Sequence, residues 1–402
     1  MGLEGTLIHR FVGGPNIVFL SGHDWKRHRK IANPAFHRAF PVKMFANQTH
    51  DMFAAMEGQD TFDVVDLFSR LTLDAIGRAG FGFNFNALRD KDNKWVTGYN
   101  SIKDGMIKPL FIMFPIFDTK LRWMFPERCK AHAHLTEFLA MLDQIIENKR
   151  NVIAEKKLAS IDDNENDLLS LMIESGLEEG DAASLSNEEL KANLCIFFLA
   201  GHDTTAYALS YIIYEMARHP DVQEKARQEA LSILGDGSDD VTPTFEQTKQ
   251  MTYLNAVIKE TLRLYNPVYG TTTRVANEDC DLNGHYMPKG TMVNINIFDL
   301  HRNPAVWESP DEFKPERFLP GGEVERQPGS GLAWVPFSNG GRQCVGMQFS
   351  LVEQRVVLSL LLRKFTFHLP ENSIHKEKLQ LRGIVFGITS VNDLTVTFKN
   401  RH

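Results

Sequence analysis

Residues Phe337 to Gly346 read FSNGGRQCVG and place a cysteine directly before a predicted helix and behind a glycine-rich turn. Helix N-terminal amides favour a thiolate, so we expect this position to lower the pKa of Cys344. The glycines of the turn allow a tight backbone approach and leave amides free to point at the sulfur. Gly346 would let the helix lie close against a flat ligand, and Arg342 offers a fork for a carboxylate. The alternative is a buried structural cysteine, the commoner role of a lone cysteine.

The composition is that of a globular protein with a large core. The chain has 402 residues, of which 43% are hydrophobic and 24% are charged. The formal net charge of −7 argues against nucleic-acid binding, which needs a basic footprint. The four cysteines form no CxxC pair and no disulfide framework, so a reducing, cytosol-facing compartment is expected. The most apolar stretch, Met106 to Phe117, is too short for a transmembrane helix.

Helical periodicity dominates the chain. Ser186 and Glu189 predict a capping box before an apolar run that stops at Pro220. The helix that they open would be on the order of 50 Å long. A helix this long and this apolar is expected to run through the middle of the fold. Further helices are predicted over 221–235, where Asp221 is the expected cap, and over 253–265 and 346–364.

Strand signals are fewer and shorter. Asn283 and Gly284 predict a tight hairpin, and residues 291–297 alternate between apolar and polar side chains. Further short strands are expected near 365–369 and 394–398. The acidic segment 161–187 is predicted to be a solvated surface connection. The expected fold class is therefore mainly α with a minor β component.

The segment Ala200 to Thr205 reads AGHDTT and lies midway along the long predicted helix. Gly201 costs about 1 kcal/mol there relative to alanine, and Thr204 can turn its hydroxyl onto the Ala200 carbonyl and loosen the helix. Asp203 is a carboxylate in an apolar run, where an unpaired charge is costly. Together these residues would make a pocket for a diatomic ligand. The alternative is a helix crossing at Gly201 with Asp203 in a salt bridge.

Charged residues recur at helical spacing elsewhere. Glu260 and Arg263 are three residues apart on one predicted helix, and such pairs are commonplace and weak when exposed. Trp25 and Arg29 are one helical turn apart, in a basic run that could also be a solvated face or a docking site for an acidic redox partner. A second charged motif, FKPERF with Arg317, precedes the cysteine loop.

Taken in order, these motifs resemble those of the cytochrome P450 family. The cysteine loop meets the pattern F-x-x-G-x-R-x-C-x-G at every fixed position, and A-G-x-D-T-T, E-x-x-R and W-x-x-x-R are also present. The resemblance extends from Trp25 to the C-terminus and implies one cytochrome P450 domain over residues 1–402. Because the chain opens just before the Trp25 helix, we expect a P450-like fold that lacks the family's N-terminal helices and sheet and its membrane anchor.

The resemblance implies haem, iron protoporphyrin IX, as the cofactor, with the thiolate of Cys344 as the iron ligand. It also implies that Asp203 and Thr204 steer protons to dioxygen. A buried structural network is implied for Glu260, Arg263 and Arg317. The residues implied to bind the cofactor are Trp25, Arg29, Ala200, Gly201, Arg274, Phe337, Arg342, Cys344 and Gly346.

By this resemblance the protein is expected to be a haem-thiolate monooxygenase that inserts one oxygen atom from dioxygen into an apolar organic substrate. Electrons would come from NADPH through NADPH-cytochrome P450 reductase, on the cytosolic face of the endoplasmic reticulum membrane. The main alternative is a haem-binding protein that is catalytically inactive because it is truncated. A haem-thiolate isomerase or dehydratase that needs no dioxygen is opposed by the Asp203–Thr204 pair. A cysteine hydrolase is opposed by the lack of a histidine motif near Cys344.

Two sets of apolar residues receive roles from the same family analogy. Phe197, Phe198 and the segments 268–273 and 385–386 are expected to face the substrate. Residues 106–117 are expected to lie on the surface near the substrate entrance and to dip into a membrane, with core packing as the alternative.

Overall fold

The computed structural model describes residues 3–38, 41–156, 167–178, 184–327, 332–385 and 387–401. Within them the fold is mostly helical with short strands, which confirms the expected class. The longer helices are α2 (Gly22–Arg38), α3 (Val42–Met56), α4 (Val64–Ile76), α5 (Lys94–Met106), α7 (Pro126–Lys156), α8 (Leu168–Glu178), α9 (Asn187–Arg218), α10 (Pro220–Leu234), α12 (Thr252–Leu264) and α15 (Met347–Lys364).

Short helices connect these elements. They are α1 (Leu7–Val12), η1 (Gly77–Phe81), α6 (Pro109–Met113), η2 (Pro115–Phe117), η3 (Arg122–Met124), α11 (Phe245–Gln250), α13 (Ile297–Leu300), η4 (Pro315–Phe318), α14 (Glu323–Arg326) and η5 (Gly340–Arg342). Every helix among the described residues is too short or too polar to span a bilayer.

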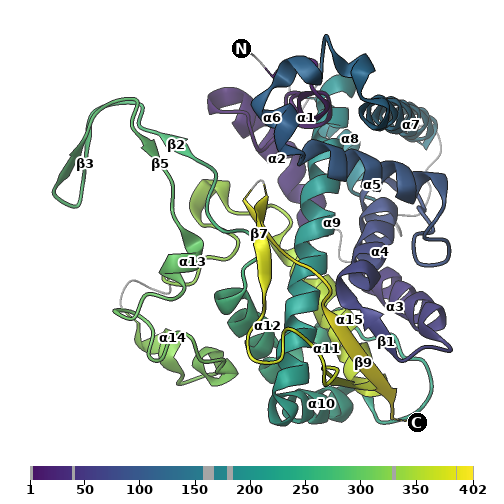
Figure 1. The fold of residues 1–402 in the computed structure, drawn as a ribbon, viewed down its shortest axis with the longest axis vertical. Coiled ribbons are helices and arrows are strands. Elements are labelled where there is room, and N and C mark those ends of the chain that lie inside the picture. Colours follow the sequence, from purple (N-terminus) through teal and green to yellow (C-terminus); the bar gives the residue numbers. More distant parts are fainter. Residues whose placement is uncertain are drawn as a thin grey trace.

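The long helix α9 runs through the middle of the molecule, as predicted (Figure 1). Its N-terminus carries the expected capping box: the Glu189 amide donates to Ser186 Oγ at 3.2 Å, and the Ser186 amide donates to Glu189 Oε2 at 2.8 Å. Most of its side chains are buried against α4, α7, α12 and α15. Because its interior turns are apolar all round, the helix is stable only inside the fold.

The other predicted helices are present, with one correction. α10 is capped by His219 and begins at Pro220, whereas Asp221 lies in its first turn. Proline suits a first helical position because the missing N–H has no intrahelical acceptor there, so the helix begins two residues earlier than a cap at Asp221 predicts. Its end at Gly235, where φ is +81°, agrees with the prediction.

The strands form small antiparallel sheets. The three-stranded sheet has the order β1 (Thr61–Asp63), β9 (Thr395–Asn400) and β6 (Phe365–His368). The two-stranded pairs are β2 (Arg274–Val275) with β5 (Met292–Val293), β3 (Cys280–Leu282) with β4 (His285–Met287), and β7 (Leu381–Val385) with β8 (Ile388–Val391). In Figure 1 the ribbon that carries β2 to β5 projects from the helical body at the upper left.

The predicted hairpin turn is confirmed, but one predicted strand is too long. Asn283 and Gly284 both have positive φ, +53° and +84°, between β3 and β4, as a tight hairpin turn requires. The strand expected over 291–297 contains only Met292 and Val293. The side chain of Asn296 accepts a hydrogen bond from the Asp299 amide at 3.1 Å and caps α13, which ends the extended conformation.

The segment 161–187 is not simply a solvated connection. Its described part contains α8, in which Leu168, Leu169 and Met172 are at most 1% exposed. These side chains form an apolar face, and α8 packs against α2 and α7. The acidic residues that suggested a surface connection precede this helix, and residues 161–166 and 179–183 lie outside the described part of the chain.

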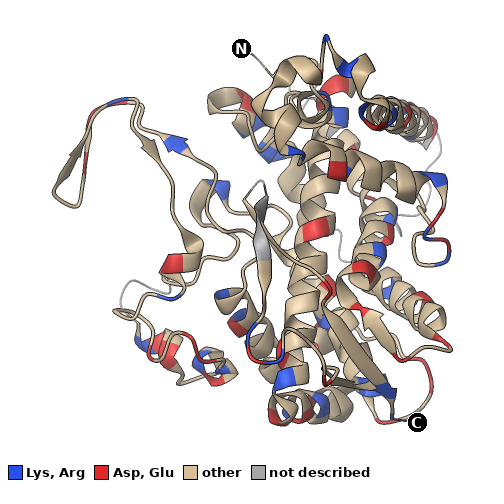
Figure 2. Ribbon diagram, in the orientation of Figure 1, with Lys and Arg blue, Asp and Glu red and all other residues tan. Residues whose placement is uncertain are grey.

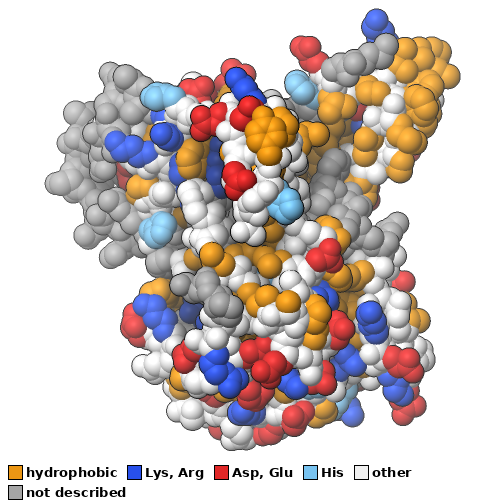
Figure 3. Space-filling view, turned by 90° about the vertical axis from the view of Figure 1, so that its left-hand side faces the viewer, with side chains coloured by type: hydrophobic (Ala, Val, Ile, Leu, Met, Phe, Trp, Pro, Cys, Tyr) orange, Lys and Arg blue, Asp and Glu red, His pale blue; other side chains and the backbone are white. Residues whose placement is uncertain are grey.

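Residues 106–117 divide between core and surface. Met106 and Phe111 are buried, so the core alternative holds for these two side chains. The neighbouring side chains are exposed and form what we call the apolar projection: Leu110, Ile112, Met113, Phe114, Ile116, Trp123 and Met124. Figure 3 shows them as a knob of hydrophobic atoms at the upper right of the molecule.

Candidate functional site

The cysteine loop is a tight turn held by its own backbone. The Cys344 amide donates to the Phe337 carbonyl at 2.9 Å, which closes the loop immediately before α15. Ser338 and Gly340 have φ of +60° and +69°, a left-handed conformation that glycine adopts without strain. Gly346 is the N-terminal cap of α15. The sequence therefore placed the thiol correctly at the start of a helix.

Two details of the cysteine environment correct the sequence-based expectation. The amides near the sulfur are those of Gly346 and Met347 at the N-terminus of α15, as the position before a helix predicted, and the turn glycines that were also expected to point at it do not supply them. Burial raises the pKa of the Cys344 thiol above its usual value, because desolvation outweighs the opposing effects of the Gly346 amide, Arg29 and the Met347 amide. The side chain nevertheless keeps exposed surface, since it faces an internal cavity.

A cavity of about 290 Å³ lies between α9, the cysteine loop and the segment after α12. Its lining is mainly apolar and includes Phe36, Ile76, Phe197 and Leu262. The predicted site residues that line it are Ala200, Gly201, Thr204, Arg274, Phe337, Arg342, Cys344 and Gly346. Motifs that are up to 146 residues apart in sequence thus line one cavity, to which Cys344 contributes a thiol and Thr204 a hydroxyl.

Three arginines gather at one side of the cavity. Arg342 stacks on the Trp25 ring, with its guanidinium carbon 4.1 Å from the ring centroid, and donates to the Leu20 carbonyl at 2.8 Å. The pKa of Arg342 is lowered, first by burial and then by the charges of Arg274 and Arg29. Among the described residues, no carboxylate forms an ion pair with any of the three arginines. Such a concentration of positive charge favours an anionic ligand.

The AGHDTT segment keeps its helical conformation. Thr204 Oγ1 donates to the Ala200 carbonyl at 2.6 Å, as predicted, but α9 remains an α-helix from Asn187 to Arg218 and is not widened there. A Cβ on Gly201 would lie 3.2 Å from Ile76 Cδ1, so the glycine allows α4 to approach α9. The predicted helix crossing is therefore present, and it lies beside the cavity.

Asp203 points away from the cavity and into an ion-pair cluster. Its Oδ1 lies 3.1 Å from Lys103 Nζ and 3.1 Å from His202 Nδ1. Burial alone would raise the pKa of Asp203, but His202 and Lys103 hold it below its usual range. The middle turns of α9 are otherwise uncharged (Figure 2). The salt-bridge alternative for Asp203 is thus observed, and Asp203 does not line the cavity with Thr204.

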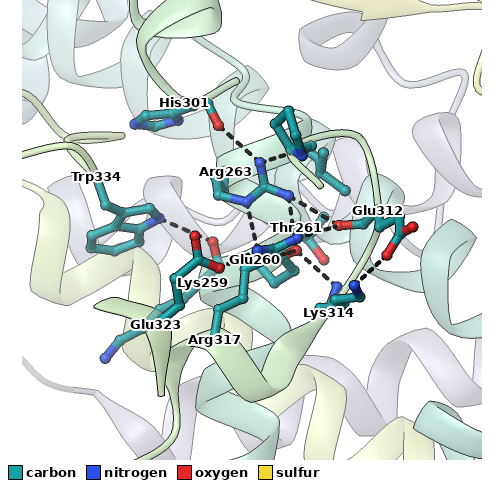
Figure 4. Close-up of polar contacts among 12 residues, drawn as sticks. Lys259, Glu260, Thr261, Arg263, His301, Glu312, Lys314, Arg317, Glu323 and Trp334 are labelled. Carbon is teal, nitrogen blue, oxygen red and sulfur yellow. Dashed lines mark hydrogen bonds and ion pairs between the residues drawn. The ribbon is translucent and has the colours of Figure 1, made fainter. Parts of the chain in front are cut away.

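The predicted charged scaffold is present and buried (Figure 4). Arg263 Nη2 and Nε donate to the two oxygens of Glu260 at 2.9 and 2.7 Å, and Arg317 Nε lies 3.3 Å from Glu260 Oε1. Glu260 also accepts from the Lys314 amide at 2.8 Å. Arg263 Nη1 donates to the His301 carbonyl at 2.8 Å, which links α12 to the long loop region before the cysteine.

Several partners of these groups lie outside the motifs that the sequence shows. Glu323 of α14 forms an ion pair with Arg317 inside the scaffold, and Lys103 of α5 does so with Asp203. Ser350 Oγ lies 2.9 Å from Thr205 Oγ1, and Gln354 Nε2 donates to the same Ser350 oxygen at 3.0 Å beside the cavity. None of these residues belongs to a spaced motif, so no sequence signal identified them.

Some of the residues that were expected to face the substrate line the cavity. Phe197 and several residues of 268–273 line the cavity, namely Val268, Gly270, Thr271 and Thr272. Phe198 does not: it packs in an aromatic cluster with Tyr99 and Phe138 on another face of α9. Consecutive helical residues point about 100° apart, so these two phenylalanines cannot share one wall. The side chain of Val385 and all of residue 386 lie outside the described structure.

Comparisons with known proteins agree with this geometry. The family model described as Cytochrome P450 matches residues 5–392. Cytochrome P450 4A10 of Rattus norvegicus is 31% identical over 88% of this chain and 69% of its own length. Cytochrome P450 3A9 of Rattus norvegicus is 32% identical over 90% of this chain and 71% of its own. The haem domain of cytochrome P450DA has a TM-score of 0.80 at 24% identity, covering 100% of this chain and 84% of that one.

The residues around the cavity fit haem, the cofactor of this family. Among the described residues, a single thiol faces the space, Gly346 leaves room beside it, and three arginines that have no carboxylate partner there match a group with two carboxylates. The comparisons give no support to the alternative of an inactive haem-binding protein. Because the family model covers most of the chain and the predicted motifs converge on one cavity, the chain belongs to the cytochrome P450 family, whose members are haem-thiolate monooxygenases.

Proposed function

We propose that this protein inserts one oxygen atom from dioxygen into an apolar organic substrate, using electrons from NADPH delivered by NADPH-cytochrome P450 reductase. The observation that carries the proposal is the placement of the Cys344 thiol and the Thr204 hydroxyl in the lining of one mainly apolar cavity. An apolar lining favours a substrate with few polar groups, because burying an unpaired polar group is costly.

In this proposal the cofactor is held by residues at two sides of the cavity. The thiolate of Cys344 would ligate the haem iron, and Arg29, Arg274 and Arg342 would bind the propionates with Trp25 beside them. Bound haem supplies the chemistry that activates dioxygen. Gly201 and Ala200 on α9 are small, so the helix can approach the cofactor closely.

We assign separate roles in proton transfer to Thr204 and Asp203. Thr204 Oγ1 would hold a proton-donating water in the cavity, after exchanging its present hydrogen bond to the Ala200 carbonyl for one to water. Asp203, which lies beyond the cavity wall, would pass protons from the Lys103 and His202 side to the hydroxyl. The Glu260 network keeps the long loop region, and with it the cysteine loop, in place.

Membrane association is the remaining part of the proposal. We place the protein on the cytosolic face of the endoplasmic reticulum membrane, because its relatives include eukaryotic enzymes of this family. The apolar projection is the surface that would touch the bilayer, since Trp123 and Met113 are 73% and 65% exposed there. Aromatic and aliphatic groups on such a surface enter the interface without crossing it.

The test combines a spectrum with a turnover measurement. The reduced, carbon-monoxide-bound protein should absorb far to the red of an imidazole-ligated haem protein. With reductase and an apolar substrate, NADPH should be consumed and oxygenated product formed. A normal thiolate spectrum without any NADPH consumption across a panel of apolar substrates would contradict the monooxygenase proposal and favour haem binding alone.

A further inference from the structure

Two arginines converge on one buried histidine beneath the apolar projection. Arg10 Nη1 of α1 lies 2.8 Å from His132 Nδ1, and Arg122 Nη1 of η3 lies 2.9 Å from the same nitrogen. The other ring nitrogen of His132 lies 2.7 Å from Asp118 Oδ1. The segments that meet here are α1, η3 and α7, which are up to 122 residues apart in sequence.

The hydrogen-bond pattern fixes the charge of this cluster. A guanidinium only donates, so His132 Nδ1 must accept from both arginines, and the neutral ring donates from Nε2 to Asp118. Burial lowers the pKa of His132, and the charges of Arg122 and Arg10 act in the same direction against Asp118. The imidazole therefore adds no charge of its own but holds two cations close together.

Neither arginine has a carboxylate partner of its own among the described residues, and Asp118 contacts them only through His132. Asp118 is already paired with Arg128, which donates to both of its carboxylate oxygens, and it also accepts from the Leu7 amide at 2.8 Å. Within the described residues, no carboxylate lies within ion-pair distance of Arg10 or Arg122. Both arginine side chains are partly exposed. Arg10 also donates to the His132 carbonyl at 3.2 Å and to Thr136 Oγ1 at 2.8 Å, which leaves the remaining N–H groups of the two guanidinium groups for an external anion.

The surroundings identify the kind of anion. Arg122 is followed directly by Trp123 and Met124, which are 73% and 51% exposed, and Phe114 of the same projection is 51% exposed. Tryptophan and basic side chains together are typical of surfaces that lie at the headgroup level of a bilayer. Binding of a soluble phosphate would require only the two arginines. The adjoining apolar side chains instead favour a ligand that carries acyl chains.

We propose that Arg10 and Arg122 form an anion site that binds the headgroup phosphate and carboxylate of an anionic phospholipid. This inference rests on the proposed membrane contact of the apolar projection and adds a lipid preference to it. The planar forks of the two arginines would bind headgroup oxygens in pairs, while the apolar side chains enter the interface. The site would also orient the protein on the membrane, because it determines which end of the molecule faces the bilayer.

The experiment measures binding of the haem-loaded protein to two kinds of vesicle, phosphatidylcholine alone and phosphatidylcholine mixed with phosphatidylserine. The wild type should bind the mixed vesicles more tightly. Arg122→Gln should lose about fivefold of that preference, the effect of one basic residue at a membrane surface. Arg122→Lys keeps the charge but should still lose a measurable part of the preference, because an ammonium group cannot form the fork. Lys249→Gln, an equal change of charge on α11 at the opposite end, should have no effect.

Each other outcome has a definite meaning. If Arg122→Lys keeps the full preference, diffuse charge explains the binding and the site is wrong. If the wild type binds both vesicles equally, the lipid assignment is wrong. In that case an Arg122-dependent rise of the melting temperature with inorganic phosphate would make this a site for free phosphate, and no such rise would mean that there is no anion site. Unchanged thiolate spectra in all variants keep these outcomes separate from failure of the proposed enzymatic function.

Discussion

Cys344 is the cysteine whose side chain lines the cavity, whereas Cys195 is buried in the core and Cys280 lies in the projecting ribbon. We expect Cys344→Ser to abolish both the red-shifted carbon-monoxide band and turnover, because a serine hydroxyl stays protonated near neutral pH and is a poor iron ligand. The absorption spectrum of the reduced protein measures this. Cys280→Ser is the matched control and should keep the band. A red-shifted band in Cys344→Ser would exclude this residue as the ligand.

Thr204 is the polar side chain of the AGHDTT segment whose proposed role depends on a hydroxyl beside the cofactor. In Thr204→Ala the helix should persist, because alanine has the higher helix propensity. Haem and substrate binding should therefore survive. The rate of product formation should fall by up to about 10²–10⁴, the usual contribution of general acid–base assistance.

The measurement for Thr204→Ala is product and hydrogen peroxide formed per NADPH consumed. Misdirected protons should divert electrons to peroxide, so its share should rise as product falls. Thr204→Ser keeps the hydroxyl and should largely restore product yield. Unchanged yield in the alanine variant would mean that Thr204 only packs against its helix and that protons take another path.

At the scale of elements, the Glu260 network links α12 to the loop region that leads to the cysteine. Glu260, Arg263 and Arg317 are at most 4% exposed, so removing the Glu260 carboxylate leaves Arg263 buried without an acidic partner and Arg317 with Glu323 alone. We expect Glu260→Ala to cost about 3–5 kcal/mol of stability, the usual loss when a buried pair is broken. Melting temperature and haem content measure this.

An exposed pair provides the control for the Glu260 prediction. Glu246 pairs with Lys249 on the surface of α11, with 72% of the Glu246 side chain exposed. Glu246→Ala should change the melting temperature little, because exposed pairs contribute little. If Glu260→Ala behaves like Glu246→Ala, the buried network does not support the cysteine loop.

The exposed side chains of the apolar projection and the buried Phe111 beside them have different roles. Phe114 and Ile116 are exposed, whereas Phe111 is buried with the Arg128 guanidinium 4.2 Å from its ring centroid. Replacing Phe114 and Ile116 with serine should weaken binding to phosphatidylcholine vesicles and spare the haem spectrum. Phe111→Ser should instead destabilise the fold. Vesicle binding that does not change in the double variant would show that the projection is not the membrane contact.

For the whole molecule, we expect paired carboxylates that join distant segments to govern the response to acid. Burial alone would raise the pKa of Asp118, but hydrogen bonds from Arg128, His132 and the Leu7 amide hold it at about 2. Glu189 has a pKa of about 2 for similar reasons, since Arg27, the Ser186 amide and His28 offset its burial.

The sign of the resulting pH dependence follows from these depressed values. The unfolded-state pKa is about 4 for such groups, so their contribution to stability is complete above that pH and is lost as the pH falls towards 2. We expect the melting temperature to fall over this range. Asp118→Asn and Glu189→Gln should each lower it at neutral pH and make the acid dependence shallower. An equally steep dependence in both variants would assign acid unfolding to other groups.

Local patterns in the sequence determined much of the fold before any tertiary contact was known. The Ser186 capping box, the proline at the end of α9 and the left-handed pair Asn283–Gly284 each act over a few residues, so their signals lie within a few residues. The same holds for the tight turn before Cys344. The predicted cap of α10, Asp221, lies only two residues from the observed cap, His219, because both residues flank Pro220.

Tertiary structure decided which partners these local elements meet. Lys103 reaches Asp203 across 100 residues, and Glu323 joins Arg317 although neither contact belongs to a motif. The periodicity of α9 identified apolar side chains but could not tell that Phe197 lines the cavity while Phe198 packs against aromatic neighbours. Helical spacing fixes the direction of a side chain relative to its own helix, whereas its surroundings depend on how separate helices pack, and that is settled only when the whole chain has folded.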